Sequence, residues 1–332
     1  MNDRREFLAS APVLAALPSA LLAQGGAVAT VTGDVPVRDL GMVLMHEHVL
    51  VDFIGADKVS RSRYDSDEVA RIALPHLREA RALGCRTLVE STPAFLGRDV
   101  ALLQLLSRES GLHIVANTGY YGAAGDKHLP AHAFKESAQQ LAQRWIDEQR
   151  QGIDGTAIRP GIMKIGVDPG GLSDVDKKLV LAAAIAHKAT GLSIASHTVD
   201  GTAVHQSLDL LDSQGVAAGA FVWVHAHNER DEASLKRAAE RGAWVEFDGL
   251  GPDSVEKHVQ LVNMMADAGH LGRVLVSHDA GWYHVGEEGG GKFRPFDTMF
   301  RRFVPALRNA VNEAAVNQLL VANPAAALAR RG

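Results

Sequence analysis

The stretch Gly41-Met-Val-Leu-Met-His46-Glu-His48-Val-Leu-Val-Asp52 decides how the rest of the chain is interpreted. It is an apolar, partly β-branched run that predicts a buried strand, with two histidines at positions i and i+2. Side chains at this spacing share one face of a strand, so His46 and His48 converge while Glu47 points the other way. Two imidazoles on one rigid face form half of a metal site. The alternative is a half-buried strand that happens to carry two histidines, and further ligands must decide between the two.

Short apolar runs alternate with longer segments of helical period through the rest of the chain. The expected strands are 43–48, 86–91, 113–118, 162–167, 193–198, 220–226, 243–248 and 273–279. Helical patterns cover 67–83, 133–151, 175–190, 202–213, 231–241 and 254–268. Eight such repeats predict an α/β fold, a (β/α)8 TIM barrel. An open, doubly wound sheet is the alternative, but no glycine-rich phosphate turn follows the first strand.

Two further segments flank this pattern. Residues 28–39 are β-rich and predict a hairpin that covers one end of the domain. Residues 296–330 have a helical pattern that Asn323-Pro324 is expected to break. We expect this tail to pack on the outside of the barrel.

Composition indicates an ordinary globular enzyme. The 332 residues are 46% hydrophobic and 22% charged, with a formal net charge of -5, which gives no basic footprint for nucleic acid. The single cysteine, Cys85, excludes an intramolecular disulfide, and its apolar surroundings predict a buried thiol.

The N-terminus resembles a twin-arginine export signal. Arg4-Arg5 precede Phe7-Leu8, an apolar stretch follows, and Ala20-Leu-Leu-Ala23 offers small residues for cleavage after Ala23. The apolar stretch is too short to anchor the protein in a membrane. We therefore expect a signal peptide over residues 1–23, a single catalytic domain over residues 24–332, and delivery by the twin-arginine export machinery to the periplasm or cell exterior. A frayed terminal helix is the alternative.

The C-terminal ends of the expected strands collect residues that bind metal. In a TIM barrel these ends carry the catalytic groups. They hold His46, His48, Lys164, His197, His225 and Asp279. Four histidines, an aspartate and a lysine exceed the four ligands of a structural zinc and suit two divalent ions that share a bridge. His227 could rival His225, but it is expected to fall in the loop.

Lys164 explains how the bridge could form. A buried, unpaired ammonium costs several kcal/mol or loses its proton, and two neighbouring cations would repel it. A neutral amine can add carbon dioxide. The resulting carbamate is an anionic oxygen ligand that can join two metals.

As a set, these residues resemble the phosphotriesterase-like branch of the binuclear-metal amidohydrolases. The resemblance is carried by His46-x-His48, the lysine of the fourth strand, the single histidines after strands five and six, and the final aspartate. Gly152-Ile-Asp-Gly-Thr, Ala195-Ser-His197-Thr and Val276-Ser-His-Asp279 narrow it to this branch, and it extends over residues 35–328.

The resemblance implies a role for each ligand. His46, His48 and Asp279 would hold the more buried ion, His197 and His225 the more exposed one, and carboxylated Lys164 and a hydroxide would bridge them. The hydroxide would attack a carbonyl carbon or a phosphorus, and Asp279 would take its proton. Zinc is the expected metal, although the same ligands accept Mn, Co or Fe. The resemblance also implies a homodimer, the usual assembly in this family.

The chain also departs from the family that it resembles. Asn228 and Gly249 stand where relatives commonly have an acidic residue and a His or Arg that work together as a proton relay. Tyr121 occupies the place of a tyrosine above the metals in related lactonases. Trp282 and Tyr283, in the glycine-rich last loop, are further candidates for substrate binding.

We expect the substrate to be a carboxylic ester, with lactones favoured and phosphotriesters as a promiscuous activity. Organophosphate (aryldialkylphosphate) hydrolysis as the main activity is one alternative. A relative that holds metal without turnover is another, and amide, deaminase-like or phosphodiester chemistry would fit the same centre.

Overall fold

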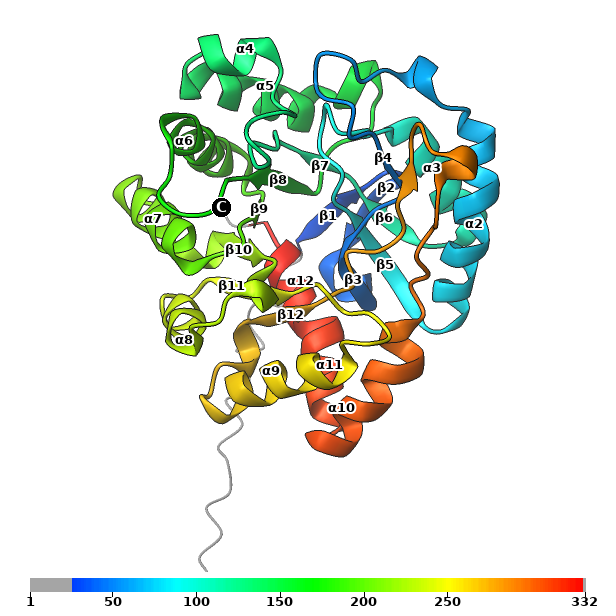
Figure 1. Cartoon of the computed structure of the whole chain (residues 1–332), viewed down its shortest axis with the longest axis vertical. Coiled ribbons are helices and arrows are strands. Elements are labelled where there is room, and N and C mark those ends of the chain that lie inside the picture. The colour runs from blue at the N-terminus through cyan, green and yellow to red at the C-terminus, as the bar shows by residue number, and fades with distance from the viewer. Residues whose placement is uncertain (1–25, 331–332) are drawn as a thin grey trace, which may run out of the picture.

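The apolar runs of the sequence form parallel strands that lie side by side in the computed structural model, which describes residues 26–330 (Figure 1). The strands are β3 (Met42–Glu47), β5 (Cys85–Glu90), β6 (His113–Val115), β7 (Asn117–Thr118), β8 (Ile162–Gly166), β9 (Ile194–His197), β10 (Phe221–Val224), β11 (Trp244–Phe247) and β12 (Val274–Val276). Each overlaps one of the runs expected from the sequence.

These strands close into a (β/α)8 TIM barrel, as predicted. One set runs β3-β5-β6 and the other β12-β11-β10-β9-β8-β7, all in parallel pairs. Only Ala116 separates β6 from β7, so the two are one interrupted strand that joins the sets. Beyond β12, the backbone N–H of Asp279 donates to His46 O at 3.0 Å, and His46 N donates to Ser277 Oγ at 3.0 Å. These bonds connect the last strand to the first.

Helices follow the strands along the chain, and most of them surround the barrel (Figure 1). They are α2 (Ser66–Ala82), α3 (Val100–Ser110), α4 (Ala131–Lys135), α5 (Ala138–Gln151), α6 (Asp174–Thr190), α7 (Gly201–Ser213), α8 (Glu232–Glu240), α9 (Val255–Asp267), α10 (Val304–Ala310), α11 (Glu313–Asn317) and α12 (Asn323–Leu328). Several begin at an Asp or Ser whose side chain accepts a bond from a backbone N–H of the first turn. Such caps satisfy amides that have no partner within the helix.

Two helical expectations need correction. The pattern at 133–151 is split into α4 and α5, because Ser137 is extended and forms a capping box with Gln140 that starts a new helix. Helix α3 was not among the expected ranges, although Asp99 caps its start and Gly111 ends it in the left-handed conformation.

The first part of the tail packs on the outside of the barrel as expected, with α10 against α9, but α12 does not. Ala325, Ala327 and Leu328 of α12 belong to the apolar cluster that contains the inward-facing residues of the strands, such as Val43 and Ile162. In Figure 1, α12 lies behind the middle of the barrel. Together with the hairpin of β1 (Ala27–Thr30) and β2 (Gly33–Pro36), the predicted end cover, it closes the N-terminal end.

Asn323-Pro324 does not break the helical tail, contrary to the sequence prediction. The π-helical turn η9 (Gln318–Ala322) runs directly into α12, because proline at the first turn needs no backbone donor. Buried Asn323 Nδ2 donates to Leu271 O at 2.8 Å and to Val274 O at 2.6 Å. The side chain thereby ties α12 to the start of β12.

The expected signal peptide, residues 1–23, lies outside the described residues. Within residues 26–330, no helix is long and apolar enough to cross a membrane.

Candidate metal centre

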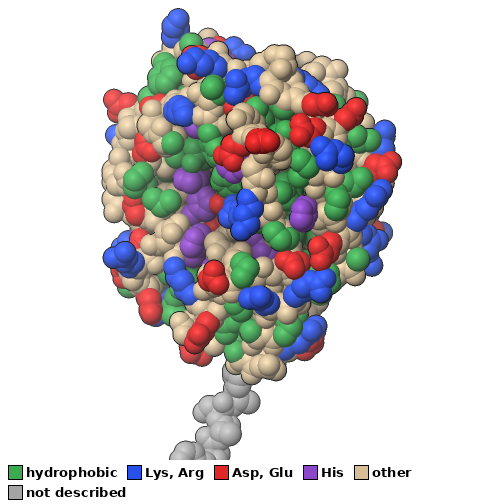
Figure 2. All heavy atoms as spheres, turned by 45° about the vertical axis from the view of Figure 1, so that its right-hand side comes forward, with side chains coloured by type: hydrophobic (Ala, Val, Ile, Leu, Met, Phe, Trp, Pro, Cys, Tyr) green, Lys and Arg blue, Asp and Glu red, His purple; other side chains and the backbone are tan. Residues whose placement is uncertain are grey.

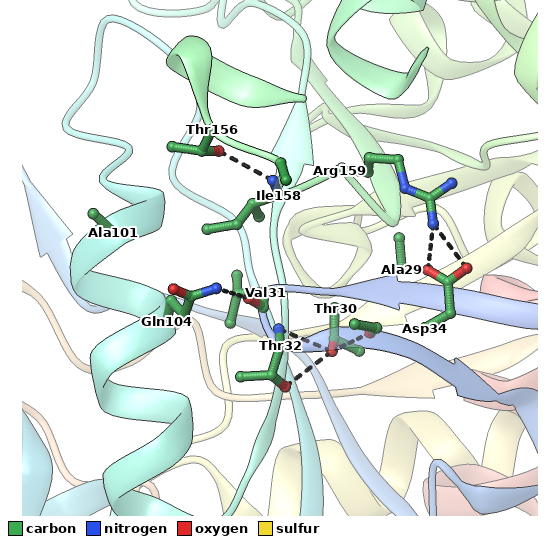
Figure 3. Close-up of a pocket in the computed structure, with 12 residues that line it drawn as sticks. Ala29, Thr30, Val31, Thr32, Asp34, Ala101, Gln104, Thr156, Ile158 and Arg159 are labelled. Atoms are coloured by element: carbon green, nitrogen blue, oxygen red, sulfur yellow. Dashed lines mark hydrogen bonds and ion pairs between the residues drawn. The ribbon is translucent and has the colours of Figure 1, made fainter. Parts of the chain in front are cut away.

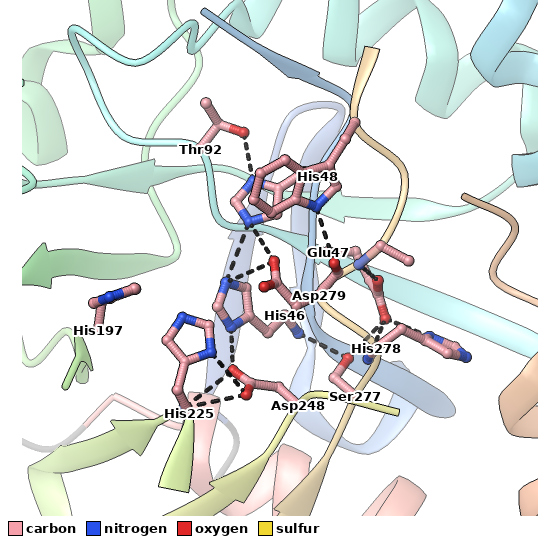
Figure 4. Close-up of polar contacts among 12 residues, drawn as sticks. His46, Glu47, His48, Thr92, His197, His225, Asp248, Ser277, His278 and Asp279 are labelled. Carbon is pink, nitrogen blue, oxygen red and sulfur yellow. Dashed lines mark hydrogen bonds and ion pairs between the residues drawn. The ribbon is translucent and has the colours of Figure 1, made fainter. Parts of the chain in front are cut away.

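Three side chains converge where β3 and β12 end (Figure 4). His46 Nε2 lies 3.3 Å from His48 Nε2, and Asp279 Oδ1 lies 3.1 Å from His48 Nε2 and 3.8 Å from His46 Nε2. Both histidines are buried, and the aspartate side chain is 23% exposed. The three ligand atoms are close enough to hold one metal ion.

A hydrogen bond at Nδ1, the ring nitrogen that faces away from the other ligands, fixes the tautomer of each histidine. Asp248 Oδ2 lies 2.5 Å from His46 Nδ1, so this nitrogen donates to the carboxylate. Thr92 Oγ1 donates its single proton to Glu90 or to Leu50 O and therefore accepts from His48 Nδ1 at 2.8 Å. Both Nε2 atoms are then free of protons. Partners of this kind orient the ligands of metal sites.

The residues fit a metal ion because without one their lone pairs oppose each other. Two unprotonated Nε2 atoms face each other, and Asp279 Oδ1 is buried without a properly oriented hydrogen-bond donor among the described residues. Burial lowers the pKa of His46 to about 4 despite the raising effect of Asp248, so the His46 ring does not take up a proton at neutral pH to relieve the repulsion. A cation between the three atoms would satisfy them all.

A second pair of ligands lies beside the first group. The ring centroids of His197 and His225 are 4.3 Å apart, and that of His225 is 5.1 Å from His46. Asp248 Oδ1 accepts from His225 Nδ1 at 2.9 Å, which leaves the Nε2 of this ring free as well. Asp248 is thus a partner of two candidate ligands through their outer nitrogens, although its oxygens also lie close enough to them to form a metal group.

The backbone is strained at two of these ligands. His225 and Asp279 have φ values of 69° and 54°, in the left-handed region that side chains other than glycine rarely adopt. Trp282 follows with a φ of 75°. Strain of this kind persists where the surrounding structure enforces it, and it is common at functional sites.

Lys164 is buried inside the barrel, as the sequence predicts for a bridging residue. The residue lies on β8, and its Nζ lies 5.7 Å from the centre of the Tyr121 ring. Burial lowers the pKa of the amine to about 8, against the raising effect of Asp279 and Asp248. Among the described residues, no hydrogen bond or ion pair joins Nζ. The neutral amine that carbamate formation needs is therefore accessible near neutral pH.

One buried acid of this region was missed by the sequence analysis. Glu246 lies on β11 two residues before Asp248, on the inward face, and it is 1% exposed. Burial raises the pKa of its carboxyl group well above the ordinary value, and its Oε1 has no hydrogen-bond partner among the described residues. Two acids at i and i+2 in an apolar strand were the available signal.

Glu47 points away from the face of His46 and His48, as predicted, and His278 is its partner. Glu47 Oε1 accepts from His278 Nδ1 at 2.6 Å and from Ser277 Oγ at 2.8 Å, and its Oε2 accepts from Ala280 N at 2.9 Å. Met299 N donates to His278 Nε2 at 3.0 Å. These contacts clamp the end of β12 to β3 and so position Asp279.

His227 lies beside the ligands and not among them. It is in the short 3-10 turn η5 (Ala226–Asn228), with its Nδ1 3.1 Å from Asp248 Oδ1 and its ring 5.7 Å from that of His258. Its imidazole fills the space next to Gly249, where an added Cβ would lie 2.3 Å from His227 Nε2. His258, on α9, is 1% exposed and lies next to the His227 ring.

The three candidates for substrate binding are placed differently. The Tyr121 hydroxyl lies 3.2 Å from His197 Nε2, and burial raises the pKa of this phenol. The Trp282 ring lies 4.9 Å from the His48 ring, and its Nε1 donates to Asp279 O at 2.9 Å. Tyr283 needs correction. It belongs to β13 (Tyr283–His284), which pairs with β4 (Leu50–Val51), and its hydroxyl donates to Glu68 of α2 at 3.2 Å.

A cavity of about 370 Å³ opens over the second pair of ligands. Its walls include His197, His225, His227, Asn228, Asp279 and Arg294. Figure 2 shows histidine side chains gathered in the middle of one face, with a Lys or Arg side chain among them. Substrate can therefore reach the ligands from solvent.

Another cavity, of about 420 Å³, lies near the N-terminal end of the barrel (Figure 3). It is formed by the β1–β2 hairpin, α3 and the segment before β8, and Arg159 Nη2 contacts both oxygens of Asp34 there at 2.7 and 2.8 Å. This cation is already paired, and no histidine lines the cavity.

Comparisons with known proteins agree with this geometry. A model of the phosphotriesterase family matches residues 26–328. A phosphotriesterase homology protein of Escherichia coli K12 is 32% identical over 290 residues, which are 86% of this chain and 96% of that protein. An aryldialkylphosphatase of Saccharolobus solfataricus is 28% identical over 300 residues, 86% of this chain and 94% of that protein. An N-acetyltaurine hydrolase of Bos taurus is 26% identical over 343 residues, 90% of this chain and 97% of that protein.

Proposed function

The chain belongs to the phosphotriesterase family, and from that premise we propose that it is a hydrolase with two divalent metal ions that cleaves carboxylic esters, with lactones favoured. One observation carries the proposal. The Nε2 atoms of His46 and His48 and Oδ1 of Asp279 converge without protons between them, beside a second histidine pair and a buried lysine.

The ligands would divide between two ions. His46, His48 and Asp279 would hold one ion, His197 and His225 the other, and Lys164, carboxylated by carbon dioxide, would bridge them. Zinc suits the imidazole and carboxylate donors. Two such ions would supply Lewis acidity and lower the pKa of a water molecule that attacks the substrate.

The protein's own residues would perform the remaining steps. Asp279 contributes Oδ1 to the ligand set and can accept the proton that the attacking water loses through its other oxygen. Tyr121 remains protonated, because burial raises its pKa, and can donate to the carbonyl oxygen of the substrate as negative charge develops there. Asp248 holds His46 and His225 in the tautomer that binds metal.

The relatives support hydrolysis and leave more than one substrate class open. The aryldialkylphosphatase supports phosphotriester hydrolysis as the main alternative, and the N-acetyltaurine hydrolase supports attack on an acyl carbon, here in an amide. A metal-binding relative without turnover is the remaining alternative. The complete ligand set, with Lys164 and Asp279 both in place, weighs against it.

We also propose that residues 1–23 direct the protein through the twin-arginine export machinery to the periplasm or cell exterior. The Arg4-Arg5 pair and the Ala20–Ala23 stretch support this assignment. N-terminal sequencing of protein recovered from the periplasm should begin at Gln24. Protein that stays in the cytoplasm with its N-terminus intact would contradict the assignment.

A substrate panel tests the proposed function. Protein loaded with metal is assayed with lactones, aryl esters, phosphotriesters and N-acyl amides, and the classes are ranked by kcat/KM. We expect lactones and esters to lead and metal analysis to give about two equivalents. Phosphotriesters ahead by orders of magnitude would replace the proposed substrate. No turnover of any class by protein that holds two metals would favour the non-catalytic alternative.

A further inference from the structure

We propose that Arg294 binds an anionic group of the substrate, so that the protein acts on acyl compounds that carry a carboxylate or a sulfonate. This inference rests on the proposed function and narrows its substrate class. Arg294 lies in the loop after β12, and its exposed side chain lines the cavity over the metal ligands together with His225 and Asp279.

The loop fixes the arginine at the mouth of the site. Arg294 N donates to Gly281 O at 2.8 Å, and Gly281 N donates to Arg294 O at 3.0 Å. Gly281 has a φ of 92°, and an added Cβ would lie 1.8 Å from His48 O, so only glycine allows this approach. The residue is thereby attached to the backbone next to two of the ligands.

The side chain is held beside the ligands as well. Arg294 Nη2 donates to the backbone oxygen of Asp279, and the guanidinium lies 5.0 Å from the centre of the Trp282 ring. Stacking on an aromatic ring orients a guanidinium without neutralising it. The remaining donors of the group are free to bind a ligand in the cavity.

Arg294 has no carboxylate partner, in contrast to arginines nearby in the chain and the fold. Arg63 lies 2.6 Å from Asp52 and Arg301 lies 2.8 Å from Glu79, whereas no ion pair involves Arg294 within residues 26–330. A guanidinium presents donors that match two oxygens of a carboxylate or similar anion. An unpaired one at the mouth of a site is suited to a ligand of that charge.

The rest of the cavity offers few competing polar groups. Once the histidines and Asp279 hold metal, the polar side chains left in its lining are His227, Asn228 and His278 besides Arg294, and His278 already has partners on both nitrogens. The exposed Asn228 amide could donate to the same anion. Val199 and Leu250 supply apolar wall, which suits a short carbon chain between the anion and the scissile bond.

Matched esters test the inference. The metal-loaded protein is assayed with mono-4-nitrophenyl adipate, 4-nitrophenyl 5-sulfopentanoate and uncharged 4-nitrophenyl hexanoate, with spontaneous hydrolysis subtracted. We expect kcat/KM to be at least about 10-fold higher for an anionic ester than for the hexanoate. The two anionic esters show whether carboxylate or sulfonate is preferred.

Variants of Arg294 test whether its side chain causes the preference for anionic esters. Arg294→Gln should remove most of the preference, mainly through a higher KM for the two anionic esters. Arg294→Lys should keep part of it. Lys292→Gln, the same loss of charge in the same loop but outside the cavity lining, should keep all of it. Equal rates for charged and neutral esters in the parent, or an unchanged preference in Arg294→Gln, would overturn the inference and leave the hydrolase proposal standing.

A binding measurement covers the case in which no ester is hydrolysed. Calorimetric titration with adipate and with hexanoate compares two carboxylates with one, and needs no turnover. Tighter binding of adipate to the parent, reduced about 10-fold or more in Arg294→Gln, would support anion recognition even if the proposed activity fails. Equal binding by both proteins would refute it.

Discussion

The imidazole of His227 occupies the space that a side chain on Gly249 would need: an added Cβ would lie 2.3 Å from His227 Nε2. The two residues belong to neighbouring βα loops, after β10 and β11. The loop after β11 therefore needs glycine at position 249 as long as His227 keeps its place.

Gly249→Ala should destabilise the protein because its methyl group and His227 cannot share this space. We expect the free energy of unfolding to fall by about 1–3 kcal/mol. His227→Ala should abolish most of that cost, so the double variant would be more stable than the sum of the single changes predicts. Denaturant unfolding of the four proteins measures the coupling. Additive effects would show that the two residues do not compete.

Lys164→Ala should lose metal and activity together. Without the bridging group, metal content is expected to fall from about two equivalents to less than one. Formate or acetate should restore part of both, because a free carboxylate can occupy the place of the carbamate. Lys178→Ala, at a partly exposed lysine whose Nζ donates to Phe134 O at 3.2 Å, is the control. Full metal content in Lys164→Ala would remove the lysine from the ligand set.

Asp248→Asn should weaken metal binding although Asp248 need not touch the metal. The amide nitrogen of asparagine cannot accept from a ring N–H, so one of His46 and His225 loses its fixed tautomer. We expect metal affinity to fall about 10–100-fold, as for other outer partners of ligands. Competition with a chelator measures it. Asp253→Asn, exposed in a nearby loop, should bind metal normally.

Removal of the hydroxyl group should have different effects at Tyr121 and at Tyr283. Tyr121→Phe is expected to lower kcat about 10-fold or more if the hydroxyl donates to the developing oxyanion. Tyr283→Phe loses a bond to Glu68 away from the ligands, so it should keep kcat and lose about 1 kcal/mol of stability or less. Equal loss of kcat in both variants would show that neither hydroxyl acts on the substrate directly.

Cys85 should make stability depend on alkaline pH. Burial raises the pKa of its thiol from 9.0 to about 12. Between these values the unfolded chain loses a proton that the folded chain keeps, so stability is complete below the lower value and falls as pH rises. From about pH 9 to about pH 11 we expect the parent to lose up to about 3 kcal/mol more than Cys85→Ala. Parallel pH profiles of the two proteins would show that the Cys85 thiol does not cause the loss of stability.

The ligand-bearing strand ends could be predicted because their signals are local. The alternation of apolar runs and amphipathic segments places each strand, and the spacing of His46 and His48 fixes the face that they share. Parallel strands in a barrel bring their C-terminal ends together, so residues as distant in sequence as His46 and Asp279 become neighbours by topology alone. Glu246 was within reach of the same reasoning, two residues before Asp248.

The features that the sequence does not reveal depend on contacts between distant segments of the chain. Tyr283 turns toward α2 because β13 pairs with β4, and nothing in the glycine-rich loop indicates that pairing. His258 lies on a helix of ordinary pattern, yet it is buried against His227 from another loop. Asn323-Pro324 reads locally as a helix end, and only the bonds from Asn323 to Leu271 and Val274 show why the segment continues.

Because α12 closes the barrel, the fold can be completed only after this late segment has been synthesised. Leu328 packs with Val28 and Val43 in one apolar cluster, so the floor of the barrel joins the first and last described segments of the chain. Val28 leaves the ribosome long before Leu328 does. Until Leu328 follows, the apolar N-terminal end of the barrel stays uncovered, and exposed apolar surface of this kind makes incomplete chains prone to aggregation.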